Sequence, residues 1–299
     1  MDLLIAHDSQ MSYALHSTVR RTGLLLAAVA SLMLAFAPAS ARVLDEVPDE
    51  PLSLADAVNK AGRQRMLAER ILKAYCLVGL GARPERAELQ LHTAVDLFDW
   101  QLIELAVLTG NHPKLTSLVD AVQNQWNEYR EIAAADVSLD GVKRLVAINR
   151  PLVNASDKLV RVLGSMTASP HDRLVSMAGR QRMLSQRIAK LYMLRDVGLD
   201  TEAVRDAIAA AGTEFDANHA ALVSAPENNA PITRDLATAA EQWTWLKSAL
   251  RYPDIERHGG DAEFFPLIVQ DASEKTLHLM DRVTMRYQRL SQTAAGLSD

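Results

Sequence analysis

The chain has 299 residues, of which 48% are hydrophobic, 23% are charged and only 5% are aromatic. This length holds one large domain or two of ordinary size, and the low aromatic content favours an all-α protein over a β-sandwich or a barrel. The formal net charge of −5 provides no general attraction to nucleic acid or to an anionic membrane surface. No nucleic-acid partner is therefore expected.

The N-terminus has the pattern of an export signal. Arg20-Arg21 precede an apolar run from Leu24 to Ala37, and Ala39-Ser40-Ala41 offers small residues for cleavage. We expect residues 1–41 to be a cleavable signal peptide and the mature protein to be periplasmic, with no membrane span. The single cysteine, Cys76, cannot form an internal disulfide in that oxidising compartment, and we expect it to be a small buried apolar residue.

Helical patterns fill the first half of the mature chain. We expect four helices here: from an N-cap at Ser53 to about Leu80, from Pro84 to about Thr109, after Pro113, and from Leu139 to about Met166. In the third, apolar residues at three- and four-residue spacing predict a face that packs into the core, and they include Trp126. Pro151 should kink the fourth helix or start a new one.

The second half repeats this plan. We expect helices from Pro170 to about Gly198, from Thr201 to about Val223, around Trp243, and after a loop at residues 252–260. Because Pro170 follows the fourth helix so closely, we expect that helix to run nearly straight into the fifth as one central rod.

One stretch of the first helix occurs twice. The sequence AGRQRMLAERILKAY at Ala61–Tyr75 returns 117 residues later as AGRQRMLSQRIAKLY at Ala178–Tyr192, with eleven of fifteen positions identical. The same offset maps Trp126 onto Trp243. Shared helix propensity alone does not produce this agreement, so we predict two tandem four-helix bundles, at residues 42–168 and 169–299.

The repeated stretch combines glycine with arginine in the middle of a helix. The residues concerned are Gly62, Arg63 and Arg65 in the first copy and Gly179, Arg180 and Arg182 in the second. Glycine costs about 1 kcal/mol in helix propensity but lets a neighbouring backbone approach closely. Arginine stays charged and presents a planar fork of N–H donors to oxygen atoms. The pattern therefore suits a packed helix interface that also admits a small anion.

Two structural explanations stay open. The arginines could be solvated or paired with carboxylates such as Glu69, although position 186 in the second copy holds Gln186 instead. Alternatively, the stretch is retained because the two helices pack on each other. In that case the glycines, Met66 and Met183 are structural.

At these residues the chain resembles a known family. The strings NKAGRQRM at Asn59–Met66 and AGRQRMLSQR at Ala178–Arg187 resemble the signature of the sensory domain shared by PilJ-type chemotaxis transducers and NarX/NarQ-type nitrate sensor kinases. The resemblance covers essentially all of the mature chain, as two successive copies. It implies a periplasmic four-helix bundle whose first helix carries the signature.

The resemblance also implies a binding mode. In the nitrate sensors two subunits bring their signature helices together, and an arginine from each clamps one nitrate on the dimer axis. The matching positions here are Arg65 and Arg182, so a tandem chain could supply both halves of the clamp. The halves differ, because Ser176-Met177 replaces Asn59-Lys60. Family members also carry membrane helices and a cytoplasmic signalling region that this sequence lacks, so we expect it to act through a membrane-bound partner.

We therefore expect an exported sensor-like protein that binds nitrate or nitrite and presents it to a membrane sensor kinase or chemotaxis transducer. The candidate ligand-binding residues are Arg65, Arg182, Gly62, Gly179, Arg63 and Arg180. The alternative is a helical interaction protein without a small ligand, which binds a transducer or an envelope component. No cofactor or metal motif and no catalytic constellation is recognisable, so we do not expect an enzyme.

Overall fold

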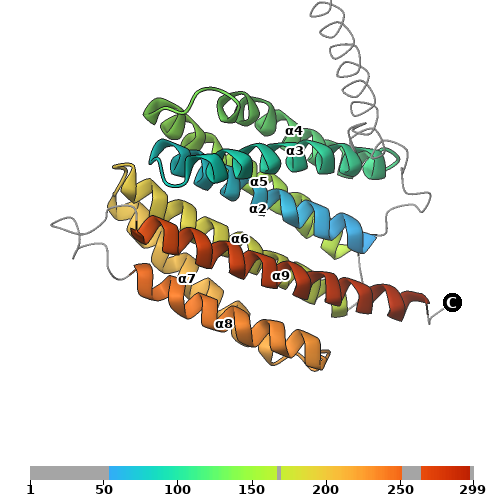
Figure 1. Cartoon of the computed structure of the whole chain (residues 1–299). Helices are drawn as coiled ribbons and strands as arrows, with labels where there is room; N and C mark the ends of the chain where they lie inside the picture. Colours follow the sequence, from blue (N-terminus) through green and yellow to red (C-terminus); the bar gives the residue numbers. More distant parts are fainter. Residues whose placement is uncertain (1–53, 167–169, 251–263, 297–299) are drawn as a thin grey trace, which may run out of the picture. The chain divides into compact units, whose positions relative to one another are not determined.

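The computed structural model describes residues 54–166, 170–250 and 264–296, which form helices without any strand (Figure 1). The signal peptide expected at residues 1–41 and the loop expected at 252–260 lie outside the described residues. The described residues all belong to one compact unit. The all-α class predicted from composition is confirmed.

The first four helices follow the predicted pattern closely. They are α2 (Leu54–Gly79), α3 (Pro84–Thr109), α4 (Pro113–Ala133) and α5 (Leu139–Ser165). Gly81 and Arg83 adopt positive φ angles of 69° and 49° in the turn before Pro84, which occupies the first turn of α3. The Ser138 side chain caps α5 by accepting a hydrogen bond from Gly141 N.

Pro151 does not end a helix, because α5 runs continuously through it. The next two side chains, Leu152 and Val153, are both buried in the core. Burying two such side chains contributes about 3 to 6 kcal/mol, which offsets the roughly 3 kcal/mol cost of a proline inside a helix. Of the two expected outcomes, a kink or a new helix, the new helix is therefore excluded.

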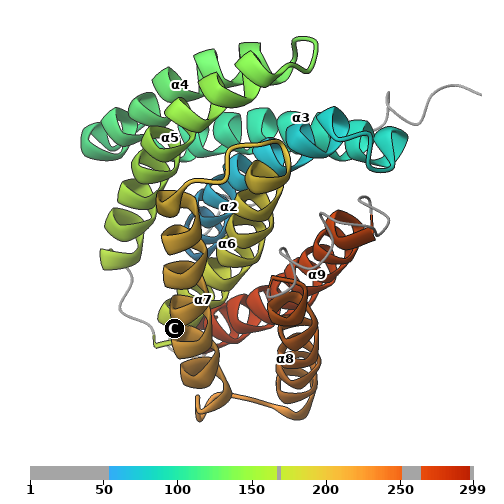
Figure 2. The ribbon, with the colours of Figure 1, turned by 90° about the vertical axis from the view of Figure 1, so that its left-hand side faces the viewer.

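The second half contributes α6 (Pro170–Asp196), α7 (Glu202–Val223), α8 (Ala230–Leu250) and α9 (Phe264–Gly296). Packing is densest where α6 lies against both α9 and α2, while α2 also packs on α3 and α5 (Figures 1 and 2). The helix that carries the first copy of the repeated stretch is therefore central, and it lies directly beside the helix that carries the second.

The two central helices are parallel and nearly in register. Lys73 Nζ on α2 donates to Gln186 Oε1 on α6 at 2.7 Å, and Arg187 Nε on α6 donates to Glu69 Oε1 on α2 at 2.8 Å. The two residues of each pair are 113 and 118 positions apart in the sequence, close to the 117-residue repeat offset. Packing of the two repeated stretches on each other, one of the explanations left open by the sequence, is thus present.

The expected central rod is not formed. On α2, Arg65 pairs with Asp157 near the end of α5, whereas Ala68 O accepts from Asn149 nearer its start, so α5 is antiparallel to α2. Since α6 is parallel to α2, the chain reverses between α5 and α6. This reversal packs the repeated stretch of α6 against α2. The apolar side chains of that stretch are thereby buried from water.

Side-chain hydrogen bonds recur at the repeat offset. The indole Nε1 of Trp126 donates to Asp99 at 2.7 Å, and that of Trp243 donates to Asp216 at 2.6 Å. Both indoles are buried, as the sequence predicted. Cys76 is also buried, and burial raises the pKa of its thiol to about 12. Its thiol therefore stays protonated at neutral pH.

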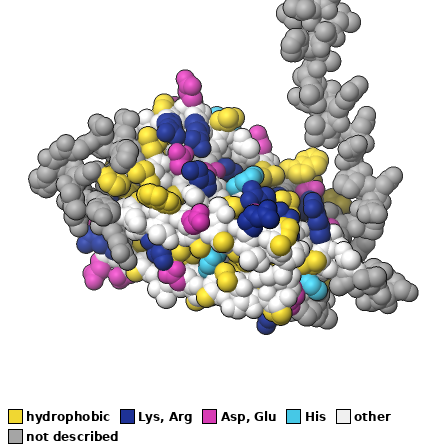
Figure 3. All heavy atoms as spheres, turned by 60° about the horizontal axis from the view of Figure 1, so that its bottom comes forward, with side chains coloured by type: hydrophobic (Ala, Val, Ile, Leu, Met, Phe, Trp, Pro, Cys, Tyr) yellow, Lys and Arg dark blue, Asp and Glu magenta, His cyan; other side chains and the backbone are white. Residues whose placement is uncertain are grey.

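On the face drawn in Figure 3, Lys and Arg side chains gather in several groups, with Asp and Glu side chains scattered among them. Among the described residues, none of the helices combines the length and apolar character that crossing a membrane requires.

Candidate functional site

The two arginines singled out by the repeat meet inside the protein. Arg65 on α2 is 3% exposed and Arg182 on α6 is fully buried. A Cβ atom placed on Gly62 would lie 3.5 Å from Arg65 Nη2 and 3.9 Å from Arg182 Nη2. The two Nη2 atoms can be no further apart than these two distances together. Both guanidinium groups therefore converge on the surface of α2 that Gly62 leaves bare.

Each of these arginines forms an ion pair with a carboxylate on a helix that is distant in the sequence but packs beside it. Arg65 Nη1 donates to Asp157 Oδ1 at 2.6 Å, and Arg182 Nη1 donates to Asp281 Oδ1 at 2.5 Å. Arg182 Nη2 also donates to Asn59 Oδ1 at 2.7 Å. The planes of both guanidinium groups are consequently fixed before any ligand arrives.

The other two arginines of the motif belong to the same network. Arg63 Nη2 donates to Asp281 at 2.7 Å. Arg180 forms a bidentate pair with Glu214, at 2.5 and 3.1 Å, and its Nη1 lies 3.4 Å from Asp157. Four motif arginines thus share three carboxylates: Asp157, Glu214 and Asp281. Arg161 also pairs with Asp157, so five arginines face these three carboxylates and the cluster has two positive charges in excess.

Three buried N–H groups at this point have no acceptor. Within the described part of the chain, no acceptor faces Arg65 Nε, Arg65 Nη2 or Arg182 Nε. A buried donor without a partner costs about 1 to 3 kcal/mol. The Nε and Nη2 donors of Arg65 lie on the same edge of its guanidinium, which is the edge that binds an oxyanion through two parallel hydrogen bonds.

Both buried arginines have lowered pKa values, and neighbouring arginines contribute to each shift. Burial lowers the pKa of Arg182 to about 10, and repulsion from Arg63 and Arg65 acts in the same direction, while Asp281 opposes it. Burial also lowers the pKa of Arg65, and Asp157 opposes that shift. At pH 7 Arg182 stays protonated, so the site retains its positive charge.

The difference between the two copies has a structural consequence. Asn59 supplies an acceptor to Arg182, and Ser176 occupies the equivalent position of the second copy. Beside Ser176 a hollow of about 270 Å³ opens, and Arg65 and the exposed Arg173 line it. The arginine cluster is therefore open to solvent on the side nearest Arg65.

Gly179, the remaining residue of the predicted set, is packed more tightly. A Cβ atom there would lie 3.2 Å from Arg182 Nη2. The glycine thus makes room for the Arg182 side chain itself, whereas Gly62 leaves space between two side chains.

Sequence reasoning missed the partners of the buried charges. Glu69 does not pair with Arg65 on its own helix; it forms ion pairs with Arg187 and Lys190 on α6 at 2.8 and 2.5 Å. Likewise, Lys73 and Arg70 pair with Glu274 on α9. Burial by itself would raise the pKa of Glu274, but Lys73 and Arg70 outweigh that effect and lower it to about 2.

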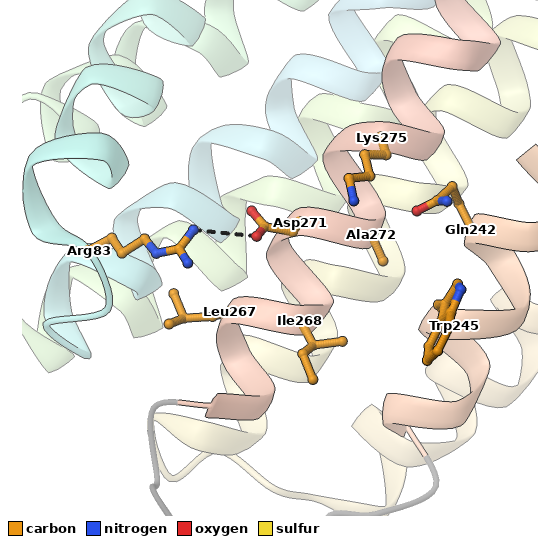
Figure 4. Close-up of a pocket in the computed structure, with 8 residues that line it drawn as sticks. All are labelled: Arg83, Gln242, Trp245, Leu267, Ile268, Asp271, Ala272 and Lys275. Atoms are coloured by element: carbon orange, nitrogen blue, oxygen red, sulfur yellow. Dashed lines mark hydrogen bonds and ion pairs between the residues drawn. The ribbon is translucent and has the colours of Figure 1, made fainter.

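A second hollow lies between α8 and α9 (Figure 4). It measures about 420 Å³, and the exposed Trp245 stands at one side, opposite Arg83, which pairs with Asp271 at 3.3 Å. None of the predicted ligand-binding residues lines it. In the described part of the chain, no group of three or more His, Cys, Asp or Glu side chains is placed to hold a metal ion.

Comparison with protein-family models gives one match. Residues 50–147 match the model of the type IV pili methyl-accepting chemotaxis transducer N-terminal domain, a sensory domain family. This match spans α2 to α4 and the start of α5, and it contains Gly62, Arg63 and Arg65 but not their counterparts on α6. No curated protein and no solved structure matches the chain.

Proposed function

We propose that this protein is a sensory domain that captures a small oxyanion, nitrate or nitrite, between α2 and α6 and reports it to a membrane-bound chemotaxis transducer or sensor kinase. The sensory role is supported by the family match over residues 50–147. The oxyanion is supported by the convergence of Arg65 and Arg182 at Gly62, with three buried N–H groups that have no acceptor among the described residues.

Charge and geometry favour a planar oxyanion. The cluster carries positive charge beyond its carboxylates, so an anion reduces the repulsion among its arginines. A planar oxyanion has several oxygen acceptors that can face the Nε and Nη2 donors of Arg65 and the Nε donor of Arg182 together. Chloride has no such directional acceptors, and sulfate is tetrahedral.

Ligand binding at this position would tie the two central helices together. Because α2 packs on α3 and α5 while α6 packs on α7 and α9, an anion between α2 and α6 links both halves of the fold. A change in how these helices pack is the kind of signal that a partner docked on the outer helices can detect.

Thermal unfolding with nitrate, nitrite, sulfate and chloride tests the proposal. A ligand at one hundred times its dissociation constant stabilises the native state by about 2.7 kcal/mol. For a protein of this size that is a rise in Tm of roughly 5–10 °C. Arg65→Lys and Arg182→Lys keep the charge but lose the planar fork, so each should abolish the nitrate effect.

Arg130→Lys is the matched control, because Arg130 is an exposed arginine that pairs with Asp99 away from Gly62. It should leave the nitrate effect unchanged. Absence of any oxyanion-dependent stabilisation of the unmodified protein would refute the proposed ligand.

A second function is favoured by one surface feature. Leu89, Trp100, Ile103 and Val107 are exposed and share one face of α3, since their spacings of eleven, three and four residues return to the same side of a helix. Such a stripe suits docking onto a partner protein without a small ligand. This alternative predicts no stabilisation by oxyanions and loss of transducer binding on Ile103→Glu.

A further inference from the structure

A separate pocket lies between α5, α6 and α7 and measures about 460 Å³. Its polar lining includes Glu69, Asn149, Arg187 and Lys190, and the rest of its lining is partly apolar. Glu214 lines it too and pairs with Arg180 of the cluster at Gly62, but none of the four motif arginines lines it. The cations of this pocket are therefore different from those of the oxyanion site proposed above.

Arg187 is held at this pocket in a fixed orientation. Its Nε donates to Glu69 Oε1 at 2.8 Å, and Glu69 is buried and also forms an ion pair with Lys190 at 2.5 Å. Lys190 is fixed in turn by Asn149 Oδ1 at 2.8 Å. The other two nitrogens of Arg187, Nη1 and Nη2, have no acceptor among the described residues. Nη1 and Nη2 form the end of the guanidinium fork and match the two oxygens of a carboxylate.

The charges around the pocket favour an anion. Arg150, Arg187 and Lys190 line it together with Glu69 and Glu214. Glu69 faces two of these cations, Glu214 is already engaged by Arg180, and the exposed Arg150 forms no ion pair within the described residues. Positive charge is thus in excess among the residues that line the pocket.

The apolar lining differs between the two halves of the chain. It consists of Val153 on α5, Leu191 on α6, and Ala207, Ala210 and Ala211 on α7. At the repeat offset, Gln90 and Thr93 stand where α7 has Ala207 and Ala210. Both residues are larger than alanine, so the alanines of α7 leave more room beside Arg187.

We propose that this pocket binds a small organic carboxylate. The carboxylate group accepts hydrogen bonds from Arg187 Nη1 and Nη2, and a short apolar chain lies against the alanines of α7. The site requires both parts of the ligand, which separates it from the site for an inorganic oxyanion.

Isothermal titration calorimetry with butyrate and acetate tests this proposal. Butyrate should bind on the order of tenfold more tightly than acetate, because it buries two further methylene groups. Ala207→Gln restores the side-chain size found at Gln90 and should weaken butyrate binding at least tenfold. Ala209→Gln, the same substitution at an exposed position that does not line the pocket, should leave it unchanged.

Two further variants separate this site from the one at Gly62. Arg187→Lys should weaken butyrate without changing nitrate binding, and Gly62→Ala should leave butyrate binding intact. No saturable binding of butyrate to the unmodified protein, or equal binding by the Ala207→Gln variant, would overturn the proposal. So would displacement of butyrate by nitrate at equal concentration.

Discussion

The substitution Gly62→Ala separates stability from ligand binding at the candidate site. The new Cβ atom would lie 3.5 Å from Arg65 Nη2 and 3.9 Å from Arg182 Nη2, which are ordinary van der Waals distances. Gly62 lies in the interior of α2, so alanine fits its backbone. The methyl group would occupy the space into which both guanidinium groups point.

The expected magnitude follows from helix propensity. Replacing a glycine by alanine within a helix stabilises it by about 0.5 to 1 kcal/mol when no clash arises. For a protein of this size that raises the Tm by roughly 1–4 °C in the absence of anion. The same methyl group removes the room for an anion, so the variant should show none of the nitrate-dependent stabilisation expected of the unmodified protein.

Urea unfolding followed by circular dichroism, with and without nitrate, measures both effects. Gly164→Ala in α5 is the matched control, because a Cβ atom there would meet no atom within 4 Å. It should also raise stability yet retain the response to nitrate. A Gly62→Ala variant that is less stable than the unmodified protein, or that still responds to nitrate, would refute the reasoning.

Three further predictions concern buried contacts. Gly141→Ala would place a Cβ atom 2.1 Å from Tyr75 Oη, so it should destabilise by about 1 to 3 kcal/mol in urea unfolding. Asp281→Asn leaves the buried Arg182 without its carboxylate and should cost about 3 to 5 kcal/mol by the same assay; a cost below 1 kcal/mol would contradict the pairing. The pKa of Glu274 is lowered from 4.5 to about 2. Its stabilisation is therefore present above pH 4.5 and is lost as the pH falls toward 2, so about 2 kcal/mol should disappear between pH 7 and pH 3, and Glu274→Gln should lack this loss.

Much of the fold could be read from the sequence because its signals are local. Pro84 and Pro113 each stand at the first residue of a helix, and Ser138 and Thr201 cap the starts of α5 and α7. These signals act within one turn of the helix. A new helix at Pro151, one of the two expected outcomes, does not form because burial of the side chains beside it, a tertiary effect, decides whether a helix continues.

The candidate site was only partly predictable. The repeat identified Arg65, Arg182 and Gly62, which do meet, because a duplicated stretch that packs on itself brings equivalent positions together. Their carboxylate partners, Asp157 and Asp281, lie 92 and 99 residues away from them, and no local pattern connects residues at that separation. These pairs form because the chain reverses between α5 and α6. The local sequence around Pro170 does not indicate that reversal.

The central claim is that Arg65 and Arg182 bind one anion together. The most direct measurement is a nitrate titration observed through the ¹⁵N-labelled Nε–H signals of arginine, with the two signals assigned by their loss in Arg65→Lys and Arg182→Lys. The Nε atoms of both residues lack an acceptor among the described residues, so both signals should shift with one common midpoint. Movement of only one signal, different midpoints, or no movement at saturating nitrate would contradict a shared site.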